Sequence, residues 1–236
     1  MPNMKVVTAL ILFILVTICE YVAGDVPIGD PPFVCDDGRT NLKIDWDGDV
    51  DDYHCLESHY WSSQRKDSIE WTEKLENFEA MPATEVCMNS SIVYEDPIPT
   101  SGAHRPLWPV YGEYTYLPPQ RWVHSLKLGA IVALYHPCTD PAEVETLRSV
   151  VRGCLRRHII SPSKELTEDL PVALVTWTWK VFLPYAYEGD MKDFIKTYAL
   201  TAPEAHKYSD GQFKKFLKAK AAMVTNERDE VLCPEE

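Results

Sequence analysis

The sequence predicts a mixed α/β fold: a small sheet with at least one β-α-β crossover and flanking helices, stabilised by disulfides and preceded by a loop-rich N-terminal extension. Three observations support this prediction. The apolar run Ala130–Tyr135 is typical of a buried strand, an amphipathic pattern from about Pro141 to Arg157 predicts a helix, and six cysteines follow an N-terminal apolar segment.

The helix prediction rests on its start signal and on its apolar face. Asp140 is a favourable N-cap, Pro141 suits the first helical position, and Glu143 lies in the first turn. Apolar side chains then recur at helical spacing, namely Val144, Leu147, Val151, Cys154 and Leu155. Cys154 is therefore expected to be buried, either as one half of a disulfide or as a packed thiol.

Strands are expected on both sides of this helix. The first contains Ala130–Tyr135, and a run rich in Val, Trp, Thr and Phe predicts the second at Val172–Leu183, after a polar connection at Ser161–Pro171. The order strand, helix, strand predicts a right-handed crossover. We therefore expect the strands near Ala130 and Val175 to be parallel.

Other elements are predicted from shorter patterns. Apolar spacing and capping residues indicate a helix from Asp190 to about Ala199 and another from Ser209 or Asp210 to about Val224. The spacing of Trp71, Leu75 and Phe78 indicates a short helix that Asp67 could cap, and Ser91–Tyr94 is expected to form a brief strand.

The N-terminus has the pattern of a secretory signal peptide over residues 1–24: Lys5, an apolar core over Val6–Ile18, and small residues before Asp25. We divide the remainder into an acidic, cysteine-containing extension (25–96), an α/β domain (97–225) and a polar tail (226–236). No later run is long enough to span a bilayer. We expect a protein that is secreted or in the secretory-pathway lumen, with no membrane association after signal removal.

Cysteine usage agrees with an oxidising compartment. Six cysteines remain after the signal, which allows three disulfides with fifteen possible pairings; they are Cys35, Cys55, Cys87, Cys138, Cys154 and Cys233. There is no C-x-x-C pair to support a thioredoxin-like redox site. Asn89-Ser90-Ser91 is a glycosylation sequon, so a surface position and a glycoprotein are predicted.

The formal charge is concentrated in the N-terminal third. Residues 25–99 contain 18 acidic and 5 basic side chains, a net of −13, whereas residues 100–236 contain 17 of each. This distribution argues against nucleic acid or anionic membrane as a partner of that region. The acidic run Asp45–Asp52 lacks the glycine and the glutamate of an EF-hand loop, so a solvated acidic loop is expected rather than a calcium site.

Histidines provide the main candidates for a functional site. Three imidazoles and a carboxylate such as Glu113 would suffice to hold a metal ion, and the possible site combines His104, His124 and Glu113, with the identity of the metal open. The alternative, which we favour, is that these histidines make structural hydrogen bonds. His136, beside Cys138, is the third histidine of this region. We expect His124 and His136 at opposite ends of one strand, roughly 40 Å apart if the chain is extended, and hence not in one site.

Nucleophilic catalysis finds little support, because no G-x-S-x-G elbow occurs, and no catalytic residue is predicted. The nearby aromatic residues form either an exposed recognition surface or a packed layer over the sheet, and the second interpretation is favoured because large aromatics usually stabilise cores. They are Trp108, Tyr111, Tyr114, Tyr116 and Trp122.

An ordered series of motifs resembles the domain-of-unknown-function family numbered 3105. The series is Pro99-Thr100-Ser101-Gly102-Ala103-His104, then Gly112-Glu113-Tyr114, then Val123-His124-Ser125-Leu126 running into Gly129–Tyr135. Among animal proteins the chain is similar to the tumour-protein-p53-inducible-protein-13 group. The family pattern V-H-x-L-E-H-G has an acid and a second histidine where this chain has Lys127 and Leu128. The resemblance implies no reaction.

Taken together, these features favour a secreted or lumenal, non-enzymatic binding or interaction protein with a protein partner and no cofactor. The alternative is a metal-binding protein or a metal-dependent enzyme that uses His104 and His124.

Overall fold

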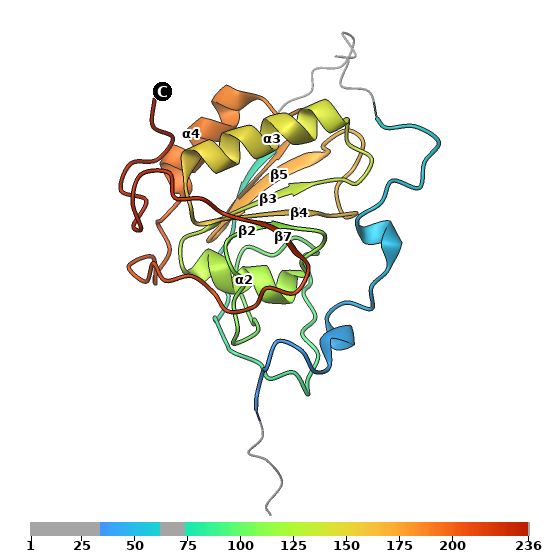
Figure 1. The fold of residues 1–236 in the computed structure, drawn as a ribbon, viewed down its shortest axis with the longest axis vertical. Coiled ribbons are helices and arrows are strands. Elements are labelled where there is room, and N and C mark those ends of the chain that lie inside the picture. The colour runs from blue at the N-terminus through green and yellow to red at the C-terminus, as the bar shows by residue number, and fades with distance from the viewer. Residues whose placement is uncertain (1–33, 62–73, 236) are drawn as a thin grey trace, which may run out of the picture. The chain divides into compact units, whose positions relative to one another are not determined.

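The computed structural model of the protein describes residues 34–61 and 74–235. Its centre is a mixed sheet of seven strands in the order β1-β6-β5-β3-β4-β2-β7 (Figure 1). The strands are β1 (Lys74–Asn77), β2 (Gly112–Tyr114), β3 (Ile131–Tyr135), β4 (His158–Pro162), β5 (Val172–Thr176), β6 (Trp179–Leu183) and β7 (Leu217–Lys220). The helices are α2 (Pro119–Lys127), α3 (Pro141–Cys154) and α4 (Glu188–Tyr198), with the short 3₁₀ turns η1 (Leu42–Ile44) and η2 (Val50–Asp52).

Strand pairing confirms the predicted α/β class and its crossover. β3 is connected through α3 to β4, which lies parallel to it, and β2 is also parallel to β4. The pairs β3 with β5, β5 with β6, β1 with β6 and β2 with β7 are antiparallel. The short β1 and β7 are the two edges of the sheet.

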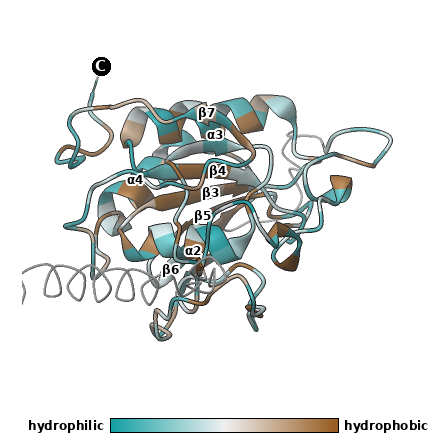
Figure 2. Ribbon diagram, turned by 60° about the horizontal axis from the view of Figure 1, so that its bottom comes forward, coloured by the Kyte–Doolittle hydropathy of each residue, from teal (hydrophilic) through white to brown (hydrophobic). Residues whose placement is uncertain are grey.

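Helices cover both faces of the sheet. α3 and α4 lie on one face and α2 lies on the other (Figure 1). Side chains alternate accordingly, because Ile131 and Ala133 belong to the core beneath α3 and α4, whereas Val132 and Leu134 belong to the core beneath α2. Burial on both faces explains why β3 and β5 are almost continuous apolar runs, coloured largely brown in Figure 2.

Three disulfides pair all six cysteines of the predicted mature chain: Cys35 with Cys87, Cys55 with Cys138, and Cys154 with Cys233. Cys154 is therefore a disulfide cysteine rather than a free thiol, and its backbone carbonyl also accepts a hydrogen bond from Cys233. No helix within residues 34–61 and 74–235 is both long and apolar enough to cross a membrane.

The second strand of the crossover differs from the prediction. Val172–Leu183 is a hairpin, β5 and β6, whose turn includes Thr178 with a φ of 64°. β5 is therefore antiparallel to β3, and the expected parallel pairing near Ala130 and Val175 is wrong. The parallel partner is β4, which begins only four residues after α3 ends and is buried throughout.

The helix expected between Ser209 and Val224 is also absent. Phe213 is buried in the core beneath α2, and its carbonyl accepts a hydrogen bond from Val110 N. Phe216 has a φ of 67°, which is incompatible with a right-handed helix, and β7 follows it as an edge strand. The carbonyls of Phe213 and Phe216 therefore accept hydrogen bonds from Val110 and Thr115, not from the next turn of a helix.

Two weaker predictions also fail. A short helix was expected around Trp71, Leu75 and Phe78, but Lys74–Asn77 form strand β1, which pairs with β6. The residues expected to begin that helix lie outside the described part of the chain. Ser91–Tyr94 forms no strand. By contrast, α3 and α4 lie where they were predicted, at Pro141–Cys154 and Glu188–Tyr198.

Candidate metal centre

His124 lies on a helix rather than at the start of a strand. Pro119 occupies the first turn of α2, where its missing N–H costs nothing, and Gly129, with a φ of 84°, lies just after the helix end. The helix buries Trp122, Val123 and Leu126 against the sheet, and His124 is buried as well. Because the strand begins only at Ile131, the expected extended path from His124 is wrong.

His104 is brought to His124 by a loop that pairs with an upstream segment. Glu85 and His104 form an isolated parallel bridge, in which His104 N donates to Thr84 O at 2.9 Å and Val86 N donates to His104 O at 2.9 Å. The bridge holds Glu85 next to His104 although 18 residues separate them in the sequence. Glu85 itself is exposed.

Both imidazoles have their tautomer fixed by the backbone. His104 Nδ1 lies 2.9 Å from Gly102 O, and His124 Nδ1 lies 2.8 Å from Arg105 O. A carbonyl oxygen only accepts, so each Nδ1 carries the proton and each neutral ring leaves a lone pair on Nε2. His104 Nε2 is buried and has no hydrogen-bond partner among the described residues.

One ring nitrogen of each histidine and a carboxylate oxygen converge. The ligand atoms of Glu85, His104 and His124 all lie within 4.8 Å of one another, and the two ring centroids are 4.4 Å apart. Ligand atoms around a tetrahedral zinc ion lie about 3.4 Å apart, given bonds of about 2.0–2.1 Å. The observed limit of 4.8 Å exceeds this separation, so binding an ion would require small movements that bring the three ligand atoms closer together.

Burial keeps both histidines neutral. It lowers the pKa of His104, and it lowers the pKa of His124 to about 4, while the hydrogen bonds to backbone carbonyls act in the opposite direction. Neutral imidazoles are the form that binds metals. Lys127 opposes a positive charge on either ring, whereas Glu204, whose carboxylate lies 3.2 Å from Lys127 Nζ, favours it.

A buried arginine ties the cluster to the N-terminal extension. Arg105, whose carbonyl orients His124, donates to Asp45 through Nε at 2.9 Å and Nη2 at 2.5 Å. Its Nη1 donates to Val86 O and Cys87 O, immediately after Glu85. Arg105 therefore contacts the chain segments that carry Glu85 and His124 at once.

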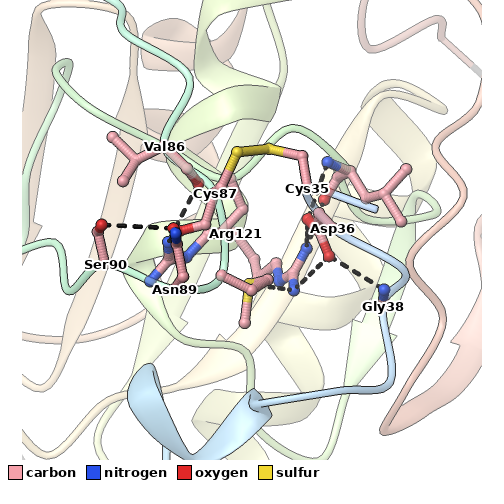
Figure 3. Close-up of a disulfide and its surroundings, with 11 residues drawn as sticks. Cys35, Asp36, Gly38, Val86, Cys87, Asn89, Ser90 and Arg121 are labelled. Carbon is pink, nitrogen blue, oxygen red and sulfur yellow. Dashed lines mark hydrogen bonds and ion pairs between the residues drawn. A yellow bond between two sulfur atoms is a disulfide. The ribbon is translucent and has the colours of Figure 1, made fainter. Parts of the chain in front are cut away.

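A second buried ion pair lies beside the disulfide Cys35–Cys87 (Figure 3). Arg121 of α2 donates to both carboxylate oxygens of Asp36, at 2.5 and 3.1 Å. Asp36 and Asp45 neutralise Arg121 and Arg105 inside the protein, which corrects the expectation of a solvated acidic loop for Asp45. Asp52 is buried as well, and it accepts from Trp46 Nε1.

Glu113 does not belong to this cluster. Its carboxylate, on β2, accepts hydrogen bonds from Arg148 and Arg152 of α3 and from Lys218 of β7. Burial alone would raise the pKa of Glu113, but the hydrogen bonds from Arg148 and Lys218 outweigh it and hold the pKa below its ordinary value. The predicted trio is therefore divided, with the two histidines together and the carboxylate elsewhere.

His136 and Cys138 also lie apart from the cluster. His136 stacks on Trp61 with the ring centroids 4.0 Å apart, and its Nδ1 accepts from Cys138 N at 3.1 Å. Cys138 is bonded to Cys55 and offers no thiolate.

The aromatic residues form a packed layer, as favoured. Tyr111, Tyr114 and Trp122 belong to the core beneath α2, and the hydroxyl of Tyr114 donates to Val110 O at 2.7 Å. Trp108 lies beside the candidate metal centre, with its ring centroid 4.9 Å from that of His124. Asn89 of the sequon is exposed in a turn next to Cys87.

Sequence reasoning missed Glu85 and the two buried arginines. Glu85 stands in an irregular stretch without periodicity, and only the bridge to His104 reveals its relevance. Because 18 residues separate Glu85 from His104, the two do not form a short sequence motif of the kind that marks metal ligands. The nearest usable signal was the cysteine at position 87, which implies that this segment is anchored to something.

The fold and the cluster together define a disulfide-stabilised α/β protein that brings two neutral histidines and one carboxylate to a common point. The model of a family described as "Protein of unknown function (DUF3105)" matches residues 85–211, more than half of the chain. The chain belongs to this family, and the match begins at Glu85 and includes both histidines. No curated protein and no solved structure matches the chain.

Proposed function

We propose that this chain is a secreted or lumenal, non-enzymatic protein that binds one divalent transition-metal ion through His104, His124 and Glu85. The observation that carries the proposal is the convergence of three ligand atoms within 4.8 Å, with the Nε2 of His104 buried and unpaired. An unpartnered buried polar atom is costly, and a metal ion would satisfy it. Two imidazoles and one carboxylate suit zinc and its neighbours in the first transition series better than calcium or magnesium.

The hydrogen-bond partners of the two imidazole rings support the same proposal. Metal-binding histidines usually donate their other N–H to a carbonyl or carboxylate, which fixes the tautomer and orients the ring. His104 and His124 both do so, to Gly102 O and Arg105 O. The site is thus oriented before any ion arrives.

Binding rather than catalysis is favoured by the residues next to His124. The family pattern has an acid and a second imidazole at the positions of Lys127 and Leu128. Leu128 is buried and apolar, and Lys127 forms an ion pair with Glu204. Neither provides a free group for proton transfer at a metal-bound water.

The test is calorimetric titration of metal-stripped protein with Zn²⁺, together with elemental analysis of protein purified from secreting cells. We expect one zinc per chain. Glu85→Gln removes an exposed ligand without disturbing the core. We expect the zinc affinity to fall more than about tenfold, because even the loss of a residue that hydrogen-bonds a metal ligand costs that much. His104→Asn and His124→Asn should abolish binding.

The matched control is His54→Ala/His59→Ala, which removes two exposed histidines outside the cluster. Its affinity should equal that of the natural chain. Absence of stoichiometric zinc, or equal losses in the control and in Glu85→Gln, would disprove the site.

Secretion, a glycan at Asn89 and membership of the animal group similar to tumour protein p53-inducible protein 13 are parts of the same proposal. The three disulfides, the signal-like N-terminus and the exposed sequon support the first two, and the motif series around His104 and His124 supports the third. Mass analysis of secreted protein before and after removal of N-glycans tests both the cleavage before Asp25 and the glycan.

A further inference from the structure

A cluster of cations lies on the face of the sheet that α3 covers, away from the candidate metal centre. Arg148 and Arg152, one helical turn apart on α3, and Lys218 on the edge strand β7 all donate to the single carboxylate of Glu113. The contacts are 3.0 Å from Arg148 Nη2, 2.6 Å from Arg152 Nη2 and 3.0 Å from Lys218 Nζ.

The charges in this cluster do not cancel. Glu113 offsets one of the three cations, and the exposed Glu145 offsets part of another through a 3.4 Å contact with Arg148. Lys220, further along β7, is paired with Asp210 at 2.9 Å. A net positive charge therefore remains, and the buried Glu113 holds like charges together that would otherwise separate.

The cationic groups remain accessible. The side chains of Arg152, Lys218 and Lys220 are 43%, 48% and 65% exposed. Among the described residues, Arg152 is seen to donate only through Nη2, and Lys218 forms one contact, although a guanidinium offers five N–H donors and an ammonium three. Donors on a helix flank and on an adjacent strand thus face solvent with their positions already set.

We propose that this cluster, Arg148, Arg152, Lys218 and Lys220, is a binding surface for a sulfated polysaccharide. Guanidinium and ammonium groups recognise sulfate as they recognise phosphate, by charge-assisted hydrogen bonds. The groups come from two elements, α3 and β7, and three of the four side chains are well exposed, which suits a polymer with repeated anionic groups better than one small anion. In a secreted protein the polyanions encountered are sulfated glycans, so this choice rests on the proposed compartment but not on the metal site.

The experiment is chromatography of the folded, oxidised chain on immobilised heparin, with elution by a salt gradient. Arg152→Gln/Lys218→Gln should elute at clearly lower salt than the natural chain. In solution, the slope of log affinity against log salt should fall by about two, roughly one for each cation removed. Lys220→Gln alone, which leaves Glu113 fully paired, should show a smaller shift in the same direction and keeps the test valid if the double variant folds poorly.

The control is Lys192→Gln/Lys207→Gln, which removes two exposed lysines elsewhere and changes the net charge equally. Its elution should match that of the natural chain. Failure to bind heparin at physiological salt, or an equal shift in the control, overturns the proposal. Stronger binding to a single-stranded DNA oligonucleotide of equal charge than to heparin also overturns it, in favour of a nucleic-acid partner.

Discussion

Replacing Asp45 with Asn tests whether the acidic extension is part of the folded core. The Arg105 and Asp45 side chains are only 0% and 3% exposed, and two of the donors on the guanidinium point at this carboxylate. Removing one partner of a buried ion pair leaves the other charge uncompensated, at a cost of about 3–5 kcal/mol. Because an Asn oxygen can still accept one hydrogen bond, we expect a loss near the lower limit, about 3 kcal/mol.

Thermal and urea unfolding followed by circular dichroism would measure this loss. For a chain of this size, about 3 kcal/mol corresponds to a fall in Tm of about 6–12 °C. Zinc affinity should fall as well, because Arg105 orients His124 and holds the carbonyls after Glu85. Asp47→Asn, at an exposed position of the same acidic run, should change stability by no more than about 0.5 kcal/mol. A loss below about 1 kcal/mol in Asp45→Asn would refute the buried-pair argument.

Three further predictions concern the sheet and its helices. The free energy of unfolding should decrease as pH falls from about 6.5 to about 4, because burial lowers the pKa of His158 to about 4 and the unfolded chain binds more protons in that window. In urea titrations, His158→Asn should remove about 3 kcal/mol of this decrease. An unchanged pH profile in this variant would contradict the prediction. Replacing Cys154 and Cys233 with Ala opens a cross-link that spans 79 residues and should cost about 4 kcal/mol without reductant, whereas an unchanged urea midpoint would contradict a stabilising role. Gly129→Ala should lower Tm, because the φ of Gly129 is 84° and an added Cβ would lie 2.9 Å from Leu200 Cα. Gly153→Ala on α3 should raise Tm slightly, because an added Cβ there meets nothing within 4 Å. Equal changes in Tm for the two variants would contradict the strain argument.

Elements with strong local signals were predicted from the sequence. The helix α3 begins as expected, because Asp140 accepts a hydrogen bond from Ala142 N at 2.8 Å and Pro141 follows it. Its apolar face then packs against the sheet through Leu147 and Val151. Local chemistry and tertiary packing agree there, so the periodic pattern was sufficient.

Prediction failed where tertiary contacts override local spacing. Phe213 and Phe216 recur at helical spacing, yet the Phe213 and Phe216 carbonyls accept from Val110 and Thr115 on another segment. The sheet, not the local pattern, decides the conformation of β7. Likewise, the short apolar run of β4 was hidden because its first residue is His158, whose burial depends on Leu155 O accepting from its ring.

The candidate site was predicted in part for a related reason. His104 and His124 stood out because residues 97–138 contain three of the seven histidines of the chain, and the resemblance included both. Their partner carboxylate was sought nearby, at Glu113, but the Glu113 carboxylate accepts hydrogen bonds from cations of α3 and β7, and Glu85 lies beside the histidines instead. A bridge between distant loops leaves no periodic trace, so the sequence alone offered no basis for choosing Glu85.

The disulfide Cys35–Cys87 has a consequence for where this protein can be made in working form. It anchors the segment that begins at Glu85, two residues before Cys87, and the same strip of chain supplies the carbonyls that receive Arg105. A chain synthesised in a reducing cytosol would lack this cross-link, and the segment around Glu85 would be held only by its bridge to His104 and by Arg105. Oxidation is therefore expected to strengthen the hold on Glu85 at the proposed metal site.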